Sequence, residues 1–277
     1  MDYKIKVLSV CDLASKRFKF FDLHENYGVV GVVEDGGSQR LYANGLLWAE
    51  WEASRFPYIY RVKWIDQARV LLWLTPSGSI IASSQSVNEA AIGFPSGVMV
   101  SDDVMFVMYG DEAVMSAKRD AYEFNVVSAF SKDGRFTCGF ADLAHQTPHE
   151  GSILVVGHYY ARHGRLTCLA YDTEYVWTFD PKERSLQRIL LGPILYANVT
   201  AFFGDEKACW LIVEGSEGLS AIALDLKSGQ KMHEIADVAD IISRNGFDPA
   251  RLSFADGYEG KMVISDGRMA GIFEMSA

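Results

Sequence analysis

Apolar and polar residues alternate along much of this chain in short runs, and a period of two residues is typical of β-strands. "KIKVLSV" (4–10) shows the alternation most clearly, and "IYRVKWI" (59–65) is a short run rich in β-branched or aromatic residues. Other runs are short and rich in β-branched or aromatic residues, which favour strands. They are "YGVVGVV" (27–33), "RVLLWL" (69–74), "VMFVMY" (104–109), "SILVVGHYY" (152–160), "ACWLIVE" (208–214) and "LSAIALDL" (219–226).

Glycine-containing turns separate these runs. The segments "EDGGS", "PSGS", "KDGR", "RHGR", "KSGQ" and "SDGR" all combine glycine with polar residues. Strands that arrive every 8–12 residues or so between such turns indicate an all-β sandwich, barrel or propeller. We therefore expect an all-β fold.

Helical periodicity is rare in the sequence. In "EIADVADIISRNGF" (234–247), four apolar residues fall on one helical face, and Asn245-Gly246 is a typical helix end. This predicts a short connecting helix near 234–245. The stretch 86–103 contains Gly93, Pro95 and Gly97, which predicts a loop.

Two phrases are nearly repeated. "GRFTCGFADL" (134–143) and "GRLTCLAYDT" (164–173) both place a cysteine, Cys138 or Cys168, soon after a Gly-Arg turn. A buried cysteine packs as a small apolar side chain. We interpret each phrase as the turn into an inner strand of a repeated sheet unit.

A second pair of similar segments supports a repeated architecture. "VWTFDPKERSLQRIL" (176–190) and "AIALDLKSGQKMHEI" (221–235) share an apolar run, an aspartate, a turn and an alternating strand. The aspartates are Asp180 and Asp225. This order predicts a hairpin between the outer two strands of a repeat.

The segment "NVTAFFGDEKACWLIVEGSEGLSAIALDLKSGQ" (198–230) resembles one blade of a β-propeller. Similar pieces make the resemblance clearest over 125–235, although Trp-Asp repeats and kelch glycine pairs are missing, so no specific family is indicated. Blades of about 40–45 residues imply six or seven four-stranded blades. The resemblance implies one propeller domain over 1–277, closed by strand 4–10 in the last blade. A β-sandwich or a pair of barrels is the alternative.

Charge and cysteine content restrict the partners and the location. The 26 Lys and Arg against 36 Asp and Glu give a net charge of −10, which disfavours nucleic acid and favours a basic protein partner. The 4 cysteines form no C-x-x-C pair, so we expect reduced thiols and a cytoplasmic location. No apolar stretch reaches the roughly 20 residues of a membrane span. We expect no membrane association, and the oligomeric state stays open.

Motifs for catalysis are not recognisable. The sequence has no G-x-S-x-G nucleophile elbow and no phosphate-binding loop. His145, His149 and Glu150 lie close together in "HQTPHE", but around a proline rather than on a helix face. We interpret this segment as a polar loop, expect no metal or cofactor, and assign no catalytic residue.

Aromatic residues are concentrated in "LLWAEWEASRFPYIY" (46–60). Trp48, Trp51, Tyr58 and Tyr60 are the candidate binding residues, since aromatic side chains often supply the binding energy of protein interfaces. The competing interpretation places them in the core, where large aromatics of sheet proteins usually lie. The two interpretations differ in the exposure of these side chains.

Three functions are consistent with these features. The first is a non-enzymatic propeller scaffold that binds another protein, such as a basic toxin that it neutralises. The second is a propeller hydrolase or lactonase with a metal or a carboxylate pair in its central channel. The third is a sensor of small molecules or glycans. The missing catalytic motifs lead us away from the enzyme.

Overall fold

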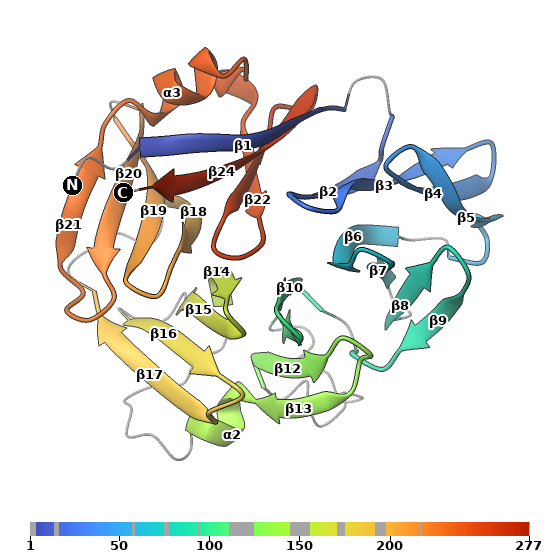
Figure 1. Cartoon of the computed structure of the whole chain (residues 1–277), viewed down its shortest axis with the longest axis horizontal. Helices are drawn as coiled ribbons and strands as arrows, with labels where there is room; N and C mark the ends of the chain where they lie inside the picture. Colours follow the sequence, from blue (N-terminus) through green and yellow to red (C-terminus); the bar gives the residue numbers. More distant parts are fainter. Residues whose placement is uncertain are drawn as a thin grey trace.

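Six sheets of four strands each form a ring in the computed structural model (Figure 1). The residues described are 4–13, 17–56, 59–74, 78–93, 95–110, 125–144, 156–170, 175–191, 198–216 and 218–276. The prediction of a β-propeller is confirmed, with six blades rather than seven. The alternative of a sandwich or a pair of barrels is wrong.

Each blade is an antiparallel meander whose first strand lies nearest the axis. Blade 1 contains β2 (Phe20–His24), β3 (Gly28–Asp35), β4 (Ser38–Ala43) and β5 (Leu46–Glu52). Blade 2 contains β6 (Ile59–Asp66), β7 (Arg69–Leu74), β8 (Gly78–Ser83) and β9 (Val87–Ala90). Blade 3 contains β10 (Gly97–Ser101), β11 (Val104–Met108), β12 (Val127–Ser131) and β13 (Phe136–Gly139).

The second half of the chain repeats this order. Blade 4 contains β14 (Val156–Arg162), β15 (Arg165–Ala170), β16 (Tyr175–Asp180) and β17 (Ser185–Leu190). Blade 5 contains β18 (Val199–Gly204), β19 (Ala208–Gly215), β20 (Gly218–Asp225) and β21 (Lys231–Ile235). Blade 6 contains β22 (Ser253–Asp256), β23 (Met262–Ser265), β24 (Met269–Ser276) and, as its outer strand, β1 (Lys4–Asp12).

The pairing of β1 with β24 joins the two ends of the chain. The strands are antiparallel, in a register that runs from Lys4 opposite Ser276 to Asp12 opposite Met269. Both termini therefore lie on the same side of the ring (Figure 1). Blade 6 is completed only by the N-terminal segment, so the ends of the chain hold the ring together.

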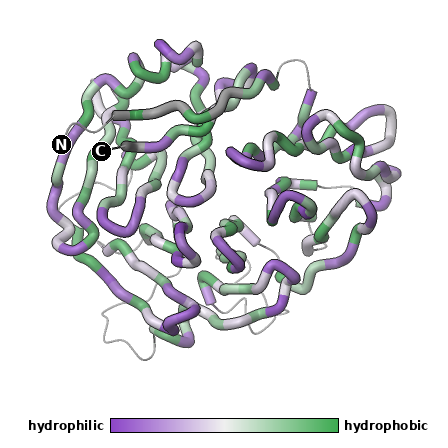
Figure 2. The backbone as a smooth tube through the Cα atoms, viewed as in Figure 1, coloured by the Kyte–Doolittle hydropathy of each residue, from purple (hydrophilic) through white to green (hydrophobic). Residues whose placement is uncertain are grey.

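Hydrophobic residues are distributed around the whole ring (Figure 2), and the buried ones form several clusters rather than one centre. The largest cluster extends over blades 1 to 3, from Val30 through Leu71 to Val107, all fully buried. Another cluster joins Phe203 of blade 5 to Phe273 of blade 6. Each blade thus buries its faces against its neighbours, as in other repeat architectures.

The near-repeated phrases do not occupy equivalent places, so their interpretation as turns into inner strands of the sheet is wrong for Gly134, although β15 after Gly164 does lie between two other strands. Gly134 precedes β13, the outer strand of blade 3, whereas Gly164 precedes β15, the second strand of blade 4. Both glycines have a positive φ, 80° and 69°. The similarity reflects a shared turn conformation that favours glycine rather than a shared position in the blade. Cys138 and Cys168 are nevertheless both buried.

The aspartate pair was interpreted correctly. Asp180 ends β16 and Asp225 ends β20, each before the outer strand of its blade. The Asp180 carboxylate accepts hydrogen bonds from the backbone N–H groups of Lys182 (3.0 Å) and Glu183 (2.9 Å). Such side chain to backbone bonds stabilise a tight turn, which explains the recurrence of aspartate.

The predicted connecting helix is confirmed as α3 (Val238–Arg244), which begins after β21 and buries Val238 and Ile242. Two shorter helices, α2 (Phe140–Ala144) and the 3₁₀ helix η3 (Pro249–Arg251), also occur in connections. None of the described helices has the length and apolar character needed to cross a bilayer.

The loop predicted over 86–103 is wrong, because β9 and β10 lie there. Gly97 misled the prediction, since glycine usually marks a turn. A Cβ atom at this position would lie 2.0 Å from the Tyr159 hydroxyl oxygen of blade 4. The glycine therefore leaves room for the Tyr159 side chain against β10.

Candidate functional site

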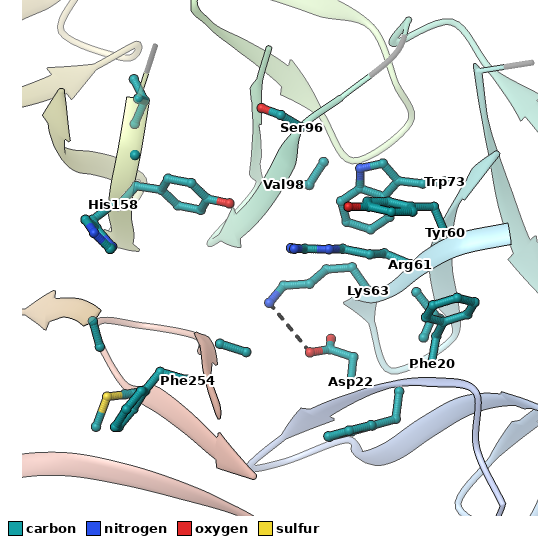
Figure 3. A pocket seen from close by; sticks show the side chains of 18 of the residues that line it. Phe20, Asp22, Tyr60, Arg61, Lys63, Trp73, Ser96, Val98, His158 and Phe254 are labelled. Atoms are coloured by element: carbon teal, nitrogen blue, oxygen red, sulfur yellow. Dashed lines mark ion pairs between the residues drawn. The ribbon is translucent and has the colours of Figure 1, made fainter. Parts of the chain in front are cut away.

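A cavity of about 750 Å³ occupies the axis of the ring. The inner strands of all six blades contribute to its wall, from Phe20 in β2 to Phe254 in β22. Figure 3 shows that side chains of different blades point into this space. This size lies within the range of small-molecule sites in proteins.

The turn between β22 and β23 crosses one end of this cavity. We call this turn, residues 257–261, the plug. Tyr258 donates a hydrogen bond to the Asp22 carboxylate of blade 1, and its hydroxyl also bonds the Trp64 carbonyl of blade 2 at 3.0 Å. Lys261 forms an ion pair with Glu25 of blade 1. These contacts attach the plug to the first two blades.

The plug also reaches blades 3 to 5. The Glu259 carboxylate accepts hydrogen bonds from the Ser101 hydroxyl of blade 3 (2.7 Å) and the His163 backbone N–H of blade 4 (3.1 Å). Gly260 donates its N–H to the Ala161 carbonyl and accepts one from the Gly204 N–H of blade 5, both at 3.0 Å. One turn of the last blade therefore bonds to all five other blades.

The plug lies where the inner strands end, whereas the cavity wall comes mainly from where they begin. Ser101, Ala161 and Gly204 lie at or near the ends of their strands, whereas Asp22 lies in the middle of β2 and also lines the cavity. Among the wall residues nearer the strand starts, Tyr60 is 51% exposed. The cavity is thus covered at one end and accessible from the other.

The wall carries more positive than negative charge. The Lys63 ammonium lies 3.6 Å from the Asp22 carboxylate, and both side chains are buried. Lys19 is paired with Glu34. Arg61 also lines the cavity, and no carboxylate of the described residues lies within ion-pair distance of its guanidinium. Arg61 is therefore the wall cation whose charge is left uncompensated in the described part of the chain.

A β-bulge near the start of β6 positions Arg61. The register with β7 shifts between Ile59 and Arg61, so Tyr60 is an additional residue in the strand. Both Tyr60 and Arg61 consequently contribute to the cavity wall, and the guanidinium carbon lies 5.8 Å from the centre of the Tyr60 ring (Figure 3). β14 and β18 show a register shift at the same place in their blades.

An aromatic cluster surrounds the buried ion pair. The His24 ring is stacked on Tyr27 at 3.8 Å and meets Tyr258 edge-on at 4.2 Å. Burial, assisted by the nearby Lys63 ammonium, lowers the pKa of His24 from 6.5 to about 4. The Lys63 ammonium lies 4.2 Å from the centre of the Tyr258 ring, within cation–π range. His24 is therefore neutral near pH 7.

The two tryptophans among the binding candidates lie mostly inside the blades. Trp51 is buried, donates its indole N–H to the Gln39 side chain at 2.7 Å and contacts the ring of Phe56. Trp48 is half-buried and meets the Trp64 ring edge-on at 5.4 Å. Both pack against the hydrophobic cluster of blades 1 to 3.

The structure describes one of the two tyrosine candidates. Tyr60 lines the cavity and is exposed, whereas Tyr58 lies outside the described residues. The binding role of all four aromatic candidates stays a prediction, and Tyr60 is the one that the structure places in a cavity.

Sequence reasoning missed the charged wall residues Arg61, Lys63 and Asp22. A signal was present, since Arg61 and Lys63 are two residues apart in an otherwise apolar strand. Residues at this spacing share one face of a strand. Charged residues that share one face of an inner propeller strand indicate either a buried ion pair or a binding site.

The enzymatic alternative needs a metal or a pair of carboxylates. Within the described residues, no three His, Cys, Asp or Glu side chains gather as metal ligands. Asp22 is the one carboxylate among the described wall residues, and it is bonded to Tyr258, to Lys63 and to the Trp64 backbone. His145, His149 and Glu150 lie outside the described part of the chain.

Comparisons with known proteins find similarity in structure but not in sequence. No family model matches the chain, and no curated protein matches it in sequence. Hsv2 of Kluyveromyces lactis is similar in structure, with a TM-score of 0.52 and 12% identity over 90% of this chain and 70% of that one. The WD40 β-propeller domain of Doa1 has a TM-score of 0.49 and 9% identity, over 92% and 77% of the two chains. BamB of Moraxella catarrhalis has a TM-score of 0.46 and 11% identity, over 98% of each.

The similarity to Hsv2 agrees with the propeller architecture that the six four-stranded sheets show. Identities of 12% or less are too low to transfer a ligand, a partner or an activity. The function has to be argued from this chain's own surface and cavity.

Proposed function

We propose that the protein is a non-enzymatic propeller scaffold that binds a basic protein on the face that carries the plug. The observation behind this proposal is a group of carboxylates in the turns around the plug. Asp66 ends the first strand of blade 2, and the turns between the first and second strands of blades 3 and 5 contain Asp102, Asp103, Asp205 and Glu206.

Two of these carboxylates are the best candidates for contact with a partner. Asp102 and Asp103 form the turn between β10 and β11, and both are exposed. Within the described residues, neither has an ion-pair partner. By contrast, Asp66 is paired with Arg69 at 2.8 Å, and Glu206 lies 3.4 Å from the His163 ring.

A basic partner suits the whole molecule as well as this face. The net charge of −10 attracts cations over a range limited by salt. The plug is bonded to five other blades, so it holds the surrounding turns in fixed positions. A preorganised surface loses little entropy when it binds. A toxin that acts on nucleic acid through positive charge is a partner of this chemistry.

The test is capture by the immobilised protein, followed by identification of the bound proteins by mass spectrometry. The variant Asp102→Lys/Asp103→Lys reverses two charges beside the plug. The control Asp240→Lys reverses an exposed charge on α3, away from the inner turns. We expect the wild type and the control to retain the same basic protein, and its purified form to bind less tightly as salt rises.

The double variant should retain that protein at least tenfold less tightly, which corresponds to about 1.4 kcal/mol. Binding of a purified basic partner that is unchanged in the double variant would contradict the assignment of the face. A failure to retain any basic protein would contradict the proposed function itself.

A further inference from the structure

Arg61 gives the cavity a property that a basic protein partner does not explain. A guanidinium is charged at any ordinary pH and presents a planar set of N–H donors. In the described part of the chain, its contact is the Tyr60 ring at 5.8 Å, without a carboxylate. The other two cations of the same wall, Lys19 and Lys63, are paired with Glu34 and Asp22.

The surroundings of Arg61 determine which anions suit it. Phe20, Tyr60 and Phe254 contribute aromatic rings to the cavity (Figure 3). The lining is therefore mixed, with aromatic rings beside cationic and other polar side chains, and a molecule that combines an anionic group with an apolar body would contact both kinds of residue. A fully hydrated inorganic ion would leave the aromatic walls without a partner.

The shape of the cavity limits the length of the ligand. The plug covers one end through hydrogen bonds to every other blade, so a polypeptide segment cannot pass through the channel. A volume of about 750 Å³ accommodates a molecule of roughly drug size. The ligand enters at the end where Tyr60 is exposed.

We propose that this cavity binds a small organic anion, whose carboxylate or phosphate is held by the Arg61 guanidinium and whose apolar body lies against Tyr60, Phe20 and Phe254. Arginine binds both anionic groups through two parallel hydrogen bonds. Tyr60 orders the guanidinium from one side and borders the entrance. This site is independent of the proposed protein-binding face, since it opens at the opposite end of the channel and has the opposite charge.

The experiment compares probes that have the same ring and opposite charge. Benzoate, phenyl phosphate and indole-3-acetate are the anions, and benzylamine and tryptamine are the cations. Each is titrated into the full chain by calorimetry and by ligand-observed NMR. We expect at least one anion to bind with one site per chain and at least tenfold more tightly than the amine with the same ring.

Variants then assign the site. Arg61→Gln should weaken the binding of that anion by about tenfold or more, because it removes the charge and one donor pair. Arg61→Lys keeps the charge without the planar fork and should restore part of the affinity. The matched control Arg40→Gln removes an arginine that is paired with Glu50 at 2.8 Å outside the cavity wall, and it should bind as the wild type does.

Thermal unfolding of each variant verifies that it is folded before it is titrated. The proposal is overturned if no anion binds at concentrations on the order of 10 mM, or if the amines bind as tightly as the anions. Equal affinity in Arg61→Gln and the wild type would overturn it as well. None of these results bears on the binding of a basic protein at the plug.

Discussion

The Tyr258 hydroxyl of blade 6 donates a hydrogen bond to the Asp22 carboxylate of blade 1, across 236 residues of sequence. The same carboxylate accepts the Trp64 backbone N–H of blade 2 at 2.8 Å. Three blades thus meet at one buried acid. This contact closes the ring from inside, whereas the pairing of β1 with β24 closes it from outside.

Removal of this hydroxyl should weaken the fold. Tyr258→Phe leaves the buried Asp22 carboxylate without one of its donors, and an unsatisfied buried polar group costs about 1–3 kcal/mol. We expect the free energy of unfolding in urea to fall by that amount. Tyr42→Phe is the control, since no hydrogen bond of the Tyr42 hydroxyl is seen among the described residues. Equal stability of the two variants would show that the contact has no role in ring closure.

The close packing of the plug predicts a strong effect of a single methyl group. A Cβ atom at Gly260 would lie 1.7 Å from the Gly204 carbonyl oxygen, and Gly260 has a φ of 75°. Gly36 also has a positive φ, 56°, but open space around it. Gly36→Ala should therefore cost about 1–2 kcal/mol through the backbone alone.

Gly260→Ala should cost a further 1–3 kcal/mol or so, because its methyl group collides with backbone of blade 5. Urea unfolding of both variants measures the difference. If both alanines have the same effect, the plug is more loosely packed than the hydrogen bonds of Gly260 indicate.

The pH dependence of stability should include a contribution from His24. The pKa of His24 is about 4 in the folded protein, lowered by burial and by Lys63, against 6.5 for an ordinary histidine. Between these values the unfolded chain binds a proton and the folded chain does not. The contribution of His24 to the free energy of unfolding is therefore complete above pH 6.5. It is lost as the pH falls towards 4.

The variant His24→Phe keeps an aromatic ring on Tyr27 but does not titrate. We expect the wild type to lose more stability than this variant between pH 7 and pH 4.5 or so, measured by urea unfolding at each pH. Parallel losses in both proteins would mean that His24 titrates with an ordinary pKa.

Local patterns were sufficient to predict the fold because propeller strands are short and alternate. "RVLLWL" corresponds to β7 (Arg69–Leu74) residue for residue, and the Asp225 turn lies between the two strands where it was expected. The Gly-Arg phrases failed because a positive φ at a turn glycine is required in any hairpin of that type. Turn chemistry thus identified strands without identifying their place in a blade.

The site was harder to predict because its residues meet only through the ring. Asp22, Lys63 and Tyr258 are far apart in sequence, and no local spacing relates them. Trp51 was a candidate for binding by residue type, but its indole N–H is satisfied by Gln39 inside the blade. Arg61 was hard to predict for another reason, since its place in the cavity wall depends on a β-bulge that the sequence pattern does not reveal.

Closure by both ends of the chain makes a prediction about circular permutation. Lys4 lies opposite Ser276 in adjacent antiparallel strands, so a short linker can join β24 to β1 as a hairpin. New termini in the connection between β1 and β2 would make every blade continuous in sequence. Arg17 in this connection is exposed, and exposed positions tolerate new ends, so a permutant that begins there should fold with a melting temperature within about 5 °C of the wild type.

The control permutant has its new ends between Glu259 and Gly260, inside the plug. This cut keeps the hairpin that joins β24 to β1. It interrupts the plug, and the hydrogen bonds of the plug to blades 3, 4 and 5 are weakened as a result. It should melt at least 10 °C or so below the first permutant, since each kcal/mol lost shifts the melting point by a few degrees. Equal melting of the two permutants would show that the outer pairing alone holds the ring, and that the plug only covers the cavity.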